Sequence, residues 1–285
     1  MTYIARLRSI YRRYIHVPAL DQAIYFVLDT LTNWYSSLCG YSFPKNYIRR
    51  WKLDILLGLY EPETARLFEK IIKPGMVIVD IGAHIGYFTR LFSKLVGATG
   101  RVYAFEADPE NYSLLQKNTH RLRNVKLFPL AVTDQHGTID FYHYPDKAGC
   151  HSTLPNVPLD YKKERITVPA DSLDSLLKTE GVKSVDLVKM DIEGGEGAAL
   201  RGMEKTLAKN TSLMMVIEFA PAWIRATRVT PLSFLQNIAD HGFKIFAIKG
   251  LELIPLVPET EASYETLIPK TPTAFNEFIN IYCTK

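Results

Sequence analysis

The sequence predicts an α/β fold with a mainly parallel sheet covered by helices on both faces. Apolar strand-like runs alternate with helical periodicity from residue 61 onward. The clearest change of period lies in "VIVDIGAHIGYFTRLF", residues 77–92, where a buried run leads through Gly82 and Gly86 into a helix. Four strand-like runs also end at an acidic residue, namely Asp80, Glu106, Asp191 and Glu218. The fold we expect is Rossmann-like and seven-stranded.

The expected elements follow in order. Helices are predicted at about 62–73, from 86 to 96, from 109, and over "PLSFLQNIADHGF". Strands are predicted at 76–80, 102–105, 125–130, in "SVDLVKMDIEG" up to Asp191, in "SLMMVIEFA" up to Glu218, in "KIFAI" and in "FNEFINIYCTK". "GTIDFYHY" alternates apolar and polar residues, as an edge strand does.

Charge and composition divide the chain into two parts. Residues 1–60 hold eight Lys/Arg against three Asp, a net charge of +5, whereas the remaining residues hold 26 basic and 27 acidic side chains. We therefore expect a basic helical extension over 1–60 and a catalytic domain over 61–285. The acidic balance of the second part argues against a nucleic-acid-binding core.

The first residues predict an amphipathic helix over 3–16, with four arginines beside its apolar face. This helix is expected either to pack on the body or to lie on an anionic membrane surface. A second helix is expected over 24–34. Three scattered cysteines, no signal peptide and no run of about 20 apolar residues predict a cytoplasmic protein, with peripheral membrane contact through the first helix as the open alternative.

The glycine turn and the next strand predict a nucleoside site. Ligands of open α/β sheets bind beyond the carboxyl ends of the strands, where Asp80 lies. His84 occupies the position that a dinucleotide-binding turn gives to its second glycine, so the turn suits a nucleoside with a small zwitterionic group better than a pyrophosphate. Glu106 follows Gly82 by 24 residues and can accept hydrogen bonds from a ribose diol. Its alternative role, capping the next helix, suits Asp108 better.

These motifs resemble a known family. "VIVDIGAHIGYFT", "VYAFEADPENYSLLQKN", "AVTDQHGTIDFY", "VDLVKMDIEGGEGAALRGM" and "MVIEFAP" occur in the order typical of FkbM-type S-adenosylmethionine-dependent methyltransferases. The resemblance covers about residues 61–285 and departs from the family at His84 and Gly195. It implies S-adenosylmethionine as cofactor, bound by Asp80, Gly82, His84, Gly86, Glu106, Ala107, Asn118 and Ala131. For Asn118 a solvated helix position is an equal alternative.

Methyl transfer to a hydroxyl requires alignment and removal of a proton. Asp191, Glu193 and Glu218 are the predicted catalytic residues, because they follow neighbouring strands above the expected methyl group. The same carboxylates would suit a divalent cation, although we assign no metal ligands. Glu193 has the alternative role of stabilising a helix N-terminus. The resemblance implies a small-molecule or glycan-like acceptor, such as a glycolipid or a natural product.

Other candidates stay open at this stage. His151 is either a base or a solvated loop residue, with Ser152 beside it in a long insertion, and Trp223 either stacks on a sugar or packs in the core. Arg225 and Arg228 are either acceptor contacts or surface charges. Two other functions are considered: an NAD(P)-dependent oxidoreductase, which His84 disfavours, and a non-enzymatic nucleoside-binding module.

Overall fold

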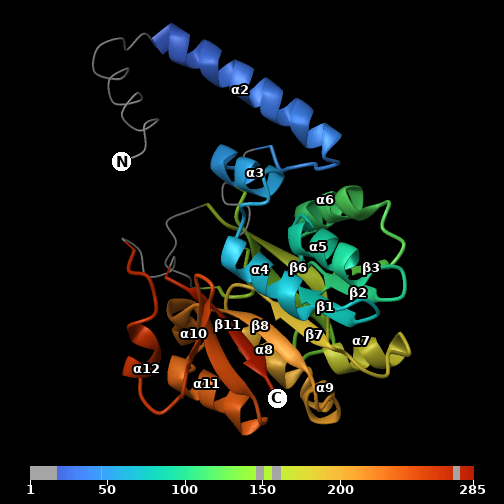
Figure 1. The fold of residues 1–285 in the computed structure, drawn as a ribbon, viewed down its shortest axis with the longest axis vertical. Coiled ribbons are helices and arrows are strands. Elements are labelled where there is room, and N and C mark those ends of the chain that lie inside the picture. The colour runs from blue at the N-terminus through green and yellow to red at the C-terminus, as the bar shows by residue number, and fades with distance from the viewer. Residues whose placement is uncertain (1–17, 46, 146–150, 156–161, 272–276) are drawn as a thin grey trace.

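The computed structural model describes residues 18–45, 47–145, 151–155, 162–271 and 277–285 (Figure 1). Its main sheet has the strand order β10-β9-β11-β8-β7-β1-β2-β3. The strands are β1 (Val77–Ile81), β2 (Arg101–Phe105), β3 (Val125–Phe128), β7 (Leu187–Met190), β8 (Met214–Phe219), β9 (Lys244–Lys249), β10 (Glu252–Pro255) and β11 (Ile279–Thr284). The five strands from β3 to β8 are parallel in the 3-2-1-4-5 order of a Rossmann fold. The predicted fold class is confirmed.

The predicted number of seven strands is wrong, because the sheet has eight. The added strand is β10, which pairs with β9 as an antiparallel hairpin at the edge. Its four residues, "ELIP", end at a proline that cannot donate to a ladder, so the pattern is too short to reveal a strand. β11 lies between β8 and β9 and is antiparallel to both.

Helices cover both faces of the sheet, as the alternation of its side chains requires. Ile78 points to a cluster with Phe68 and Phe92, whereas Val79 and Ile81 point to the opposite cluster. The first face carries α4 (Pro62–Ile71), α5 (Tyr87–Val96) and α6 (Pro109–Thr119). The second carries α7 (Leu173–Thr179), α8 (Glu196–Arg201), α9 (Glu204–Lys209), α10 (Pro221–Ala226), α11 (Pro231–Asp240) and α12 (Ala262–Glu265).

A second sheet, in the order β4-β6-β5, lies apart from the first. Its strands are β4 (Ala131–Val132), β5 (Gly137–His143) and β6 (Glu164–Asp171). β5 contains the predicted edge strand and is indeed at the edge. The expected strand 125–130 ends instead at Phe128, because Pro129 lacks an N–H and Ala131 begins pairing with β6. Sequence analysis missed β6, whose alternation is interrupted by Pro169.

In the described part of the chain, two helices precede α4 and the sheet: α2 (Pro18–Leu38) and α3 (Arg49–Leu56). α2 includes the helix expected over 24–34 and is the outermost described element at one end of the molecule (Figure 1). The helix expected over 3–16 lies outside the described residues. No described helix combines the length and apolar content that crossing a bilayer requires.

The segment between α2 and α3 is hydrogen-bonded to the body. Asn118 accepts from the Ser42 N–H at 2.6 Å and donates to the Ser42 carbonyl at 3.0 Å. Arg90 donates to the carbonyls of Gly40 and Cys39, at 2.6 and 2.8 Å. These contacts attach the segment to α5 and α6.

Two glycines, one inside α8 and one at its C-terminus, provide a test of the contact between this helix and the second sheet. A Cβ at Gly202, which ends α8, would lie 2.0 Å from the carbonyl oxygen of Thr133 beside the second sheet. Gly202→Ala is therefore expected to lower the free energy of unfolding by about 1–3 kcal/mol or more. The control is Gly197→Ala inside α8, where the nearest atom is 3.8 Å away and alanine should stabilise by up to about 1 kcal/mol. Urea denaturation measures both, and equal effects would contradict the close approach.

Candidate active site

A cavity of about 1020 Å³ lies at the carboxyl ends of the parallel strands. Its floor is formed by the residues that follow β1, β2, β7 and β8. One wall is the second sheet, through Ile139 and Phe141, and another is the segment leading into α3, through Tyr47 and Trp51. Such a volume is large enough to hold a nucleoside and a second molecule together.

The glycine turn is set by backbone contacts. Gly82 has φ +79°, and its N–H and that of Ala83 both donate to the Phe105 carbonyl, at 3.0 and 2.9 Å. A Cβ at Gly82 would lie 1.9 Å from the Asp191 carbonyl oxygen, so only glycine fits there. Gly86 has φ +91° and precedes α5, with Leu115 packed closely over it.

Glu106 follows β2 and is hydrogen-bonded to the glycine turn. Its two carboxylate oxygens accept from the His84 N–H at 2.7 Å and the Asp108 N–H at 2.9 Å. Burial raises the pKa of Glu106 to about 7, against the lowering effect of these two donors. The side chain lines the cavity beside Ala107 and is 7% exposed. It therefore offers its remaining lone pairs to a ligand.

His84 lines the cavity and carries a buried, unpaired polar atom. Its backbone has φ +51°, and its ring lies 5.7 Å from the ring of Tyr47. Among the described residues its Nε2 has no hydrogen-bond partner, although it is buried. Burial lowers the pKa of His84 to about 4, so the ring is neutral near pH 7. A buried orphan of this kind fits a site built for a polar ligand.

Three predicted cofactor residues do not line the cavity: Asp80, Gly86 and Asn118. Asp80 is fully buried below the turn, where its Oδ2 accepts from Thr89 Oγ1 at 2.6 Å. Asn118 is not solvated, because it is 5% exposed and its amide also donates to the Ile85 carbonyl at 2.8 Å. Asp80 and Asn118 thus hold α5 and the turn from outside the cavity. Gly82, His84, Glu106, Ala107 and Ala131 do line the cavity.

Lys189 is a buried cation that sequence analysis missed. Its Nζ lies 3.1 Å from Asp191 Oδ2, 3.9 Å from Asp80 Oδ1 and 3.2 Å from the Gly82 carbonyl oxygen. Burial alone would lower the pKa of Lys189, but the surrounding carboxylates, Asp191 first, outweigh burial and raise it. A lysine inside the otherwise apolar run "LVKM" of a buried strand was the available signal.

The three predicted catalytic carboxylates come together. Asp191, Glu193 and Glu218 each offer an oxygen within 4.8 Å of the others, and all three line the cavity. Burial, followed by the charges of Asp191 and Glu193, raises the pKa of Glu218 well above its usual value. Glu61, which sequence analysis also missed, lines the same cavity, and burial raises its pKa to about 7.

The turn after β7 is held by a neighbouring segment. Ser152 Oγ donates to the Glu193 carbonyl at 2.6 Å, and Glu193 itself has φ +49°. Glu196, in the first turn of α8, accepts from the Ile192 N–H at 3.1 Å through its Oε1 and so also holds this turn. Glu193 lines the cavity.

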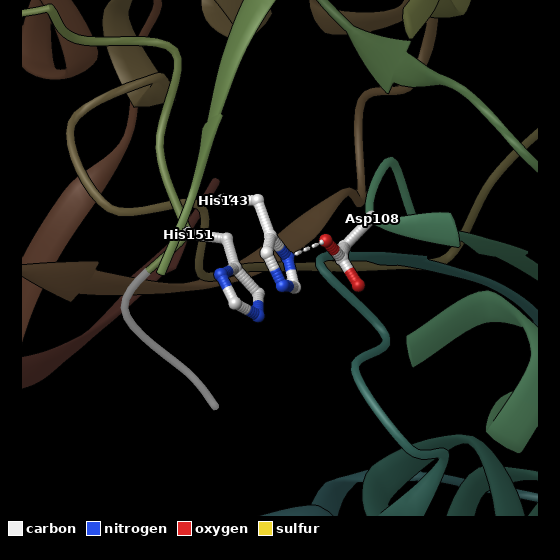
Figure 2. A group of neighbouring side chains, drawn as sticks. All are labelled: Asp108, His143 and His151. Atoms are coloured by element: carbon white, nitrogen blue, oxygen red, sulfur yellow. Dashed lines mark hydrogen bonds and ion pairs between the residues drawn. The ribbon is translucent and has the colours of Figure 1, made fainter. Parts of the chain in front are cut away.

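Asp108, His143 and His151 form a second cluster beside the cavity (Figure 2). Asp108 caps α6, as expected, and its Oδ2 also accepts from His143 Nδ1 at 2.5 Å. The two imidazole rings are stacked with centroids 4.5 Å apart and planes 15° apart, so their in-plane lone pairs run parallel rather than converge on one ion. The cluster therefore connects the N-terminus of α6 to the end of β5.

His151 is poorly suited to act as a base. Its Nδ1 accepts from the Tyr144 N–H at 3.1 Å, and burial lowers its pKa to about 4. It is neither solvated nor poised near neutral pH. Trp223 is 2% exposed and also lines the cavity, whereas Arg225 donates to Tyr264 away from it.

Comparison with protein families shows which family this chain belongs to. Residues 80–245 match the family described as Methyltransferase FkbM domain. The chain belongs to the FkbM methyltransferase family. The match includes the glycine turn, Glu106 and all three clustered carboxylates, and it leaves Tyr47 and Trp51 outside. The family expected from the sequence is confirmed, and with it a Rossmann-like fold that uses S-adenosylmethionine.

Among curated FkbM relatives, the 2-O-methyltransferase NoeI of Sinorhizobium fredii is 31% identical over 149 residues, covering 48% of this chain and 61% of the relative. The hexuronic acid methyltransferase AglP of Haloferax volcanii is 28% identical over 160 residues, covering 55% and 61%. The 31-O-demethyl-FK506 methyltransferase FkbM of Streptomyces tacrolimicus is 28% identical over 160 residues, covering 47% and 61%. The chain thus spans less than two thirds of each relative.

Solved structures resemble this chain only distantly. An rRNA methylase from Streptococcus thermophilus aligns with a TM-score of 0.44 and 10% identity, covering 78% of this chain and 93% of that one. An O-methyltransferase from Thermotoga maritima aligns with a TM-score of 0.42 and 12% identity, covering 81% and 70%. We therefore assign the fold from the strand order of this chain itself.

The charge balance around Lys189 can be tested by unfolding. Lys189→Met should lower the free energy of unfolding by about 3–5 kcal/mol, because it leaves buried carboxylates without a cation. Asp80→Asn combined with Lys189→Met should recover part of that loss, since one of these carboxylates is then neutral. Chemical denaturation measures both. If Lys189→Met alone were as stable as the unchanged protein, the ion pairs of Lys189 would not stabilise the strand ends.

Proposed function

We propose that this chain transfers a methyl group from S-adenosylmethionine to a hydroxyl oxygen of a glycan, glycolipid or natural-product acceptor. The observation that carries the proposal is one cavity lined both by the glycine turn with Glu106 and by Asp191, Glu193 and Glu218. Family membership favours methyl transfer over hydride transfer. The relatives NoeI, AglP and FkbM, whose names describe O-methylation or methylation of a hexuronic acid, support the acceptor class.

The turn and Glu106 are assigned to the cofactor. Glu106 accepts from the ribose hydroxyls, with Ala107 and Ala131 beside the nucleoside, and His84 Nε2 is a further polar contact. Asp80, Gly86 and Asn118 act indirectly by holding the turn. When bound, S-adenosylmethionine supplies an electrophilic methyl group on a sulfonium.

The carboxylate cluster is assigned to the acceptor. A carboxylate accepts the proton of the acceptor hydroxyl as the oxygen–methyl bond forms and the sulfur–methyl bond breaks, which yields a methyl ether and S-adenosylhomocysteine. Glu218 is the favoured base, because burial and the neighbouring carboxylates raise its pKa well above the usual value and so increase its affinity for a proton. Asp191 is paired with Lys189 and is better suited to orienting the acceptor.

Cofactor binding should depend on pH through Glu106. The ionised carboxylate accepts hydrogen bonds and prevails above a pKa of about 7, so affinity is retained at higher pH and lost as the pH falls. Between one unit above and one unit below that value, the affinity for S-adenosylhomocysteine should fall about tenfold. Calorimetric titration measures this fall.

Glu106→Gln should weaken binding and remove the pH dependence, whereas Glu110→Gln, at an exposed position of α6, should keep both. Stabilisation by NAD(P)H and not by S-adenosylhomocysteine in thermal unfolding would refute the proposed cofactor.

Removing the proposed base should lower turnover without weakening cofactor binding. Glu218→Gln is expected to lower kcat by about 10²–10⁴-fold, with little change in S-adenosylhomocysteine affinity. The assay follows S-adenosylhomocysteine release with hexuronic-acid glycosides as trial acceptors. Unchanged kcat in this variant would exclude Glu218, and loss of activity with EDTA that Mg²⁺ restores would assign the cluster to a cation instead.

A further inference from the structure

The described N-terminal segment exposes an unusual share of apolar side chains. Ten of the fourteen large apolar residues that the described chain exposes lie within residues 27–59. Six belong to α2: Val27, Leu28, Leu31, Trp34, Tyr35 and Leu38. The other four lie in or beside α3: Ile48, Leu53, Leu57 and Leu59. Exposed apolar residues gathered in one place indicate an interaction surface.

The six apolar residues of α2 share one face. At 3.6 residues per turn they fall within an arc of about 120°, with Leu31 and Leu38 nearest its centre and Trp34 and Leu28 at its margins. Leu38 is 65% exposed and Trp34 is 62% exposed. We call this set of six the apolar face of α2.

The opposite, polar face of α2 is the one turned to the protein. Its only buried residues among 27–38 are Thr32 and Ser36, at 8% and 4% exposure. Asp29, on the same side, pairs with Arg49 of α3 through two hydrogen bonds of 2.7 and 2.8 Å. A surface helix normally buries its apolar side and exposes its polar side. α2 does the reverse.

The charge of this part of the chain indicates what covers the apolar face. Residues 1–60 carry a net charge of +5, while the rest is slightly acidic. α2 itself carries Asp21 and Asp29 and no Lys or Arg, so the cations belong to the stretches before and after it in the sequence. Four arginines lie within residues 6–13, and after α2 Lys45 is exposed and the side chain of Arg50 is 87% exposed. An apolar helix face that includes Trp34 and Tyr35, with basic stretches before and after it in the chain, matches a helix lying in the interface of an anionic membrane.

We infer that α2 docks this protein on an anionic lipid surface through its apolar face. The inference does not depend on the chemistry proposed for the cavity. Because α3 follows directly and Trp51 lines the cavity, docking would bring the cavity wall close to the membrane.

Co-sedimentation of the full chain with vesicles tests the inference. The protein should sediment with vesicles of equal parts phosphatidylcholine and phosphatidylglycerol, less with phosphatidylcholine alone, and less at high salt. Leu31→Ser, Trp34→Ser and Leu38→Ser combined should lower partitioning at least about tenfold. The matched control is Asn33→Ala with Ser37→Ala, two exposed polar positions of α2, which should bind as the unchanged protein does.

Several results would overturn the inference. One is no sedimentation with the anionic vesicles, or equal sedimentation of the triple variant. Another is a dimer in light scattering that the triple variant dissociates without vesicle binding, which would make a second copy the occupant. A third is a marked loss of thermal stability in the triple variant, which would show that the chain covers this face itself. Vesicle binding that requires residues 1–17 and not the apolar face would also reject α2 as the contact.

Discussion

The ion pairs of Lys189 are the interaction on which the floor of the cavity depends. One ammonium group contacts carboxylates that end β1 and follow β7, as well as the carbonyl of Gly82. It thereby joins two neighbouring strands to the turn that leads from β1 into α5. The turn can approach β7 closely only because Gly82 has no side chain, so the cation and the glycine act together. Neither feature alone would bring the backbone and the carboxylates to one place.

This single cation is also surrounded by more carboxylates than it can balance. Asp191 takes the closest contact, and Glu218, Glu61 and Glu106 line the cavity with the pKa of each raised. The cavity thus contains several acids that hold a proton more tightly than free carboxylic acids do. Perturbed pKa values gathered in one cavity are typical of catalytic sites.

Sequence analysis predicted the sheet and the ligand turn because both depend on local patterns. Continuous apolar runs indicate buried parallel strands, and two glycines at a strand end indicate a close backbone approach. It could not tell a residue that lines the cavity from one that supports it. Asp80 and Glu106 both lie at the carboxyl end of a strand, yet Asp80 is buried below the turn and Glu106 lines the cavity. The path of the backbone after each strand decides between these two positions. Lys189 was missed because two of its three partners, Asp80 and Gly82, are distant in sequence, and β6 because Pro169 interrupts its pattern.

The N-terminal segment is attached to the body through both backbone and side-chain contacts. Asn118 and Arg90 bind backbone atoms of Ser42, Gly40 and Cys39, and the Arg90 guanidinium also lies over the ring of Tyr41, 4.0 Å from its centroid. Tyr47 and Trp51, which follow, form a wall of the cavity yet lie outside the part of the chain that the family shares. None of these hydrogen bonds involves the side chains of Tyr47 and Trp51, so mutation can reshape that wall without removing those bonds. Related proteins could diversify in the molecules they recognise while the shared part stays unchanged.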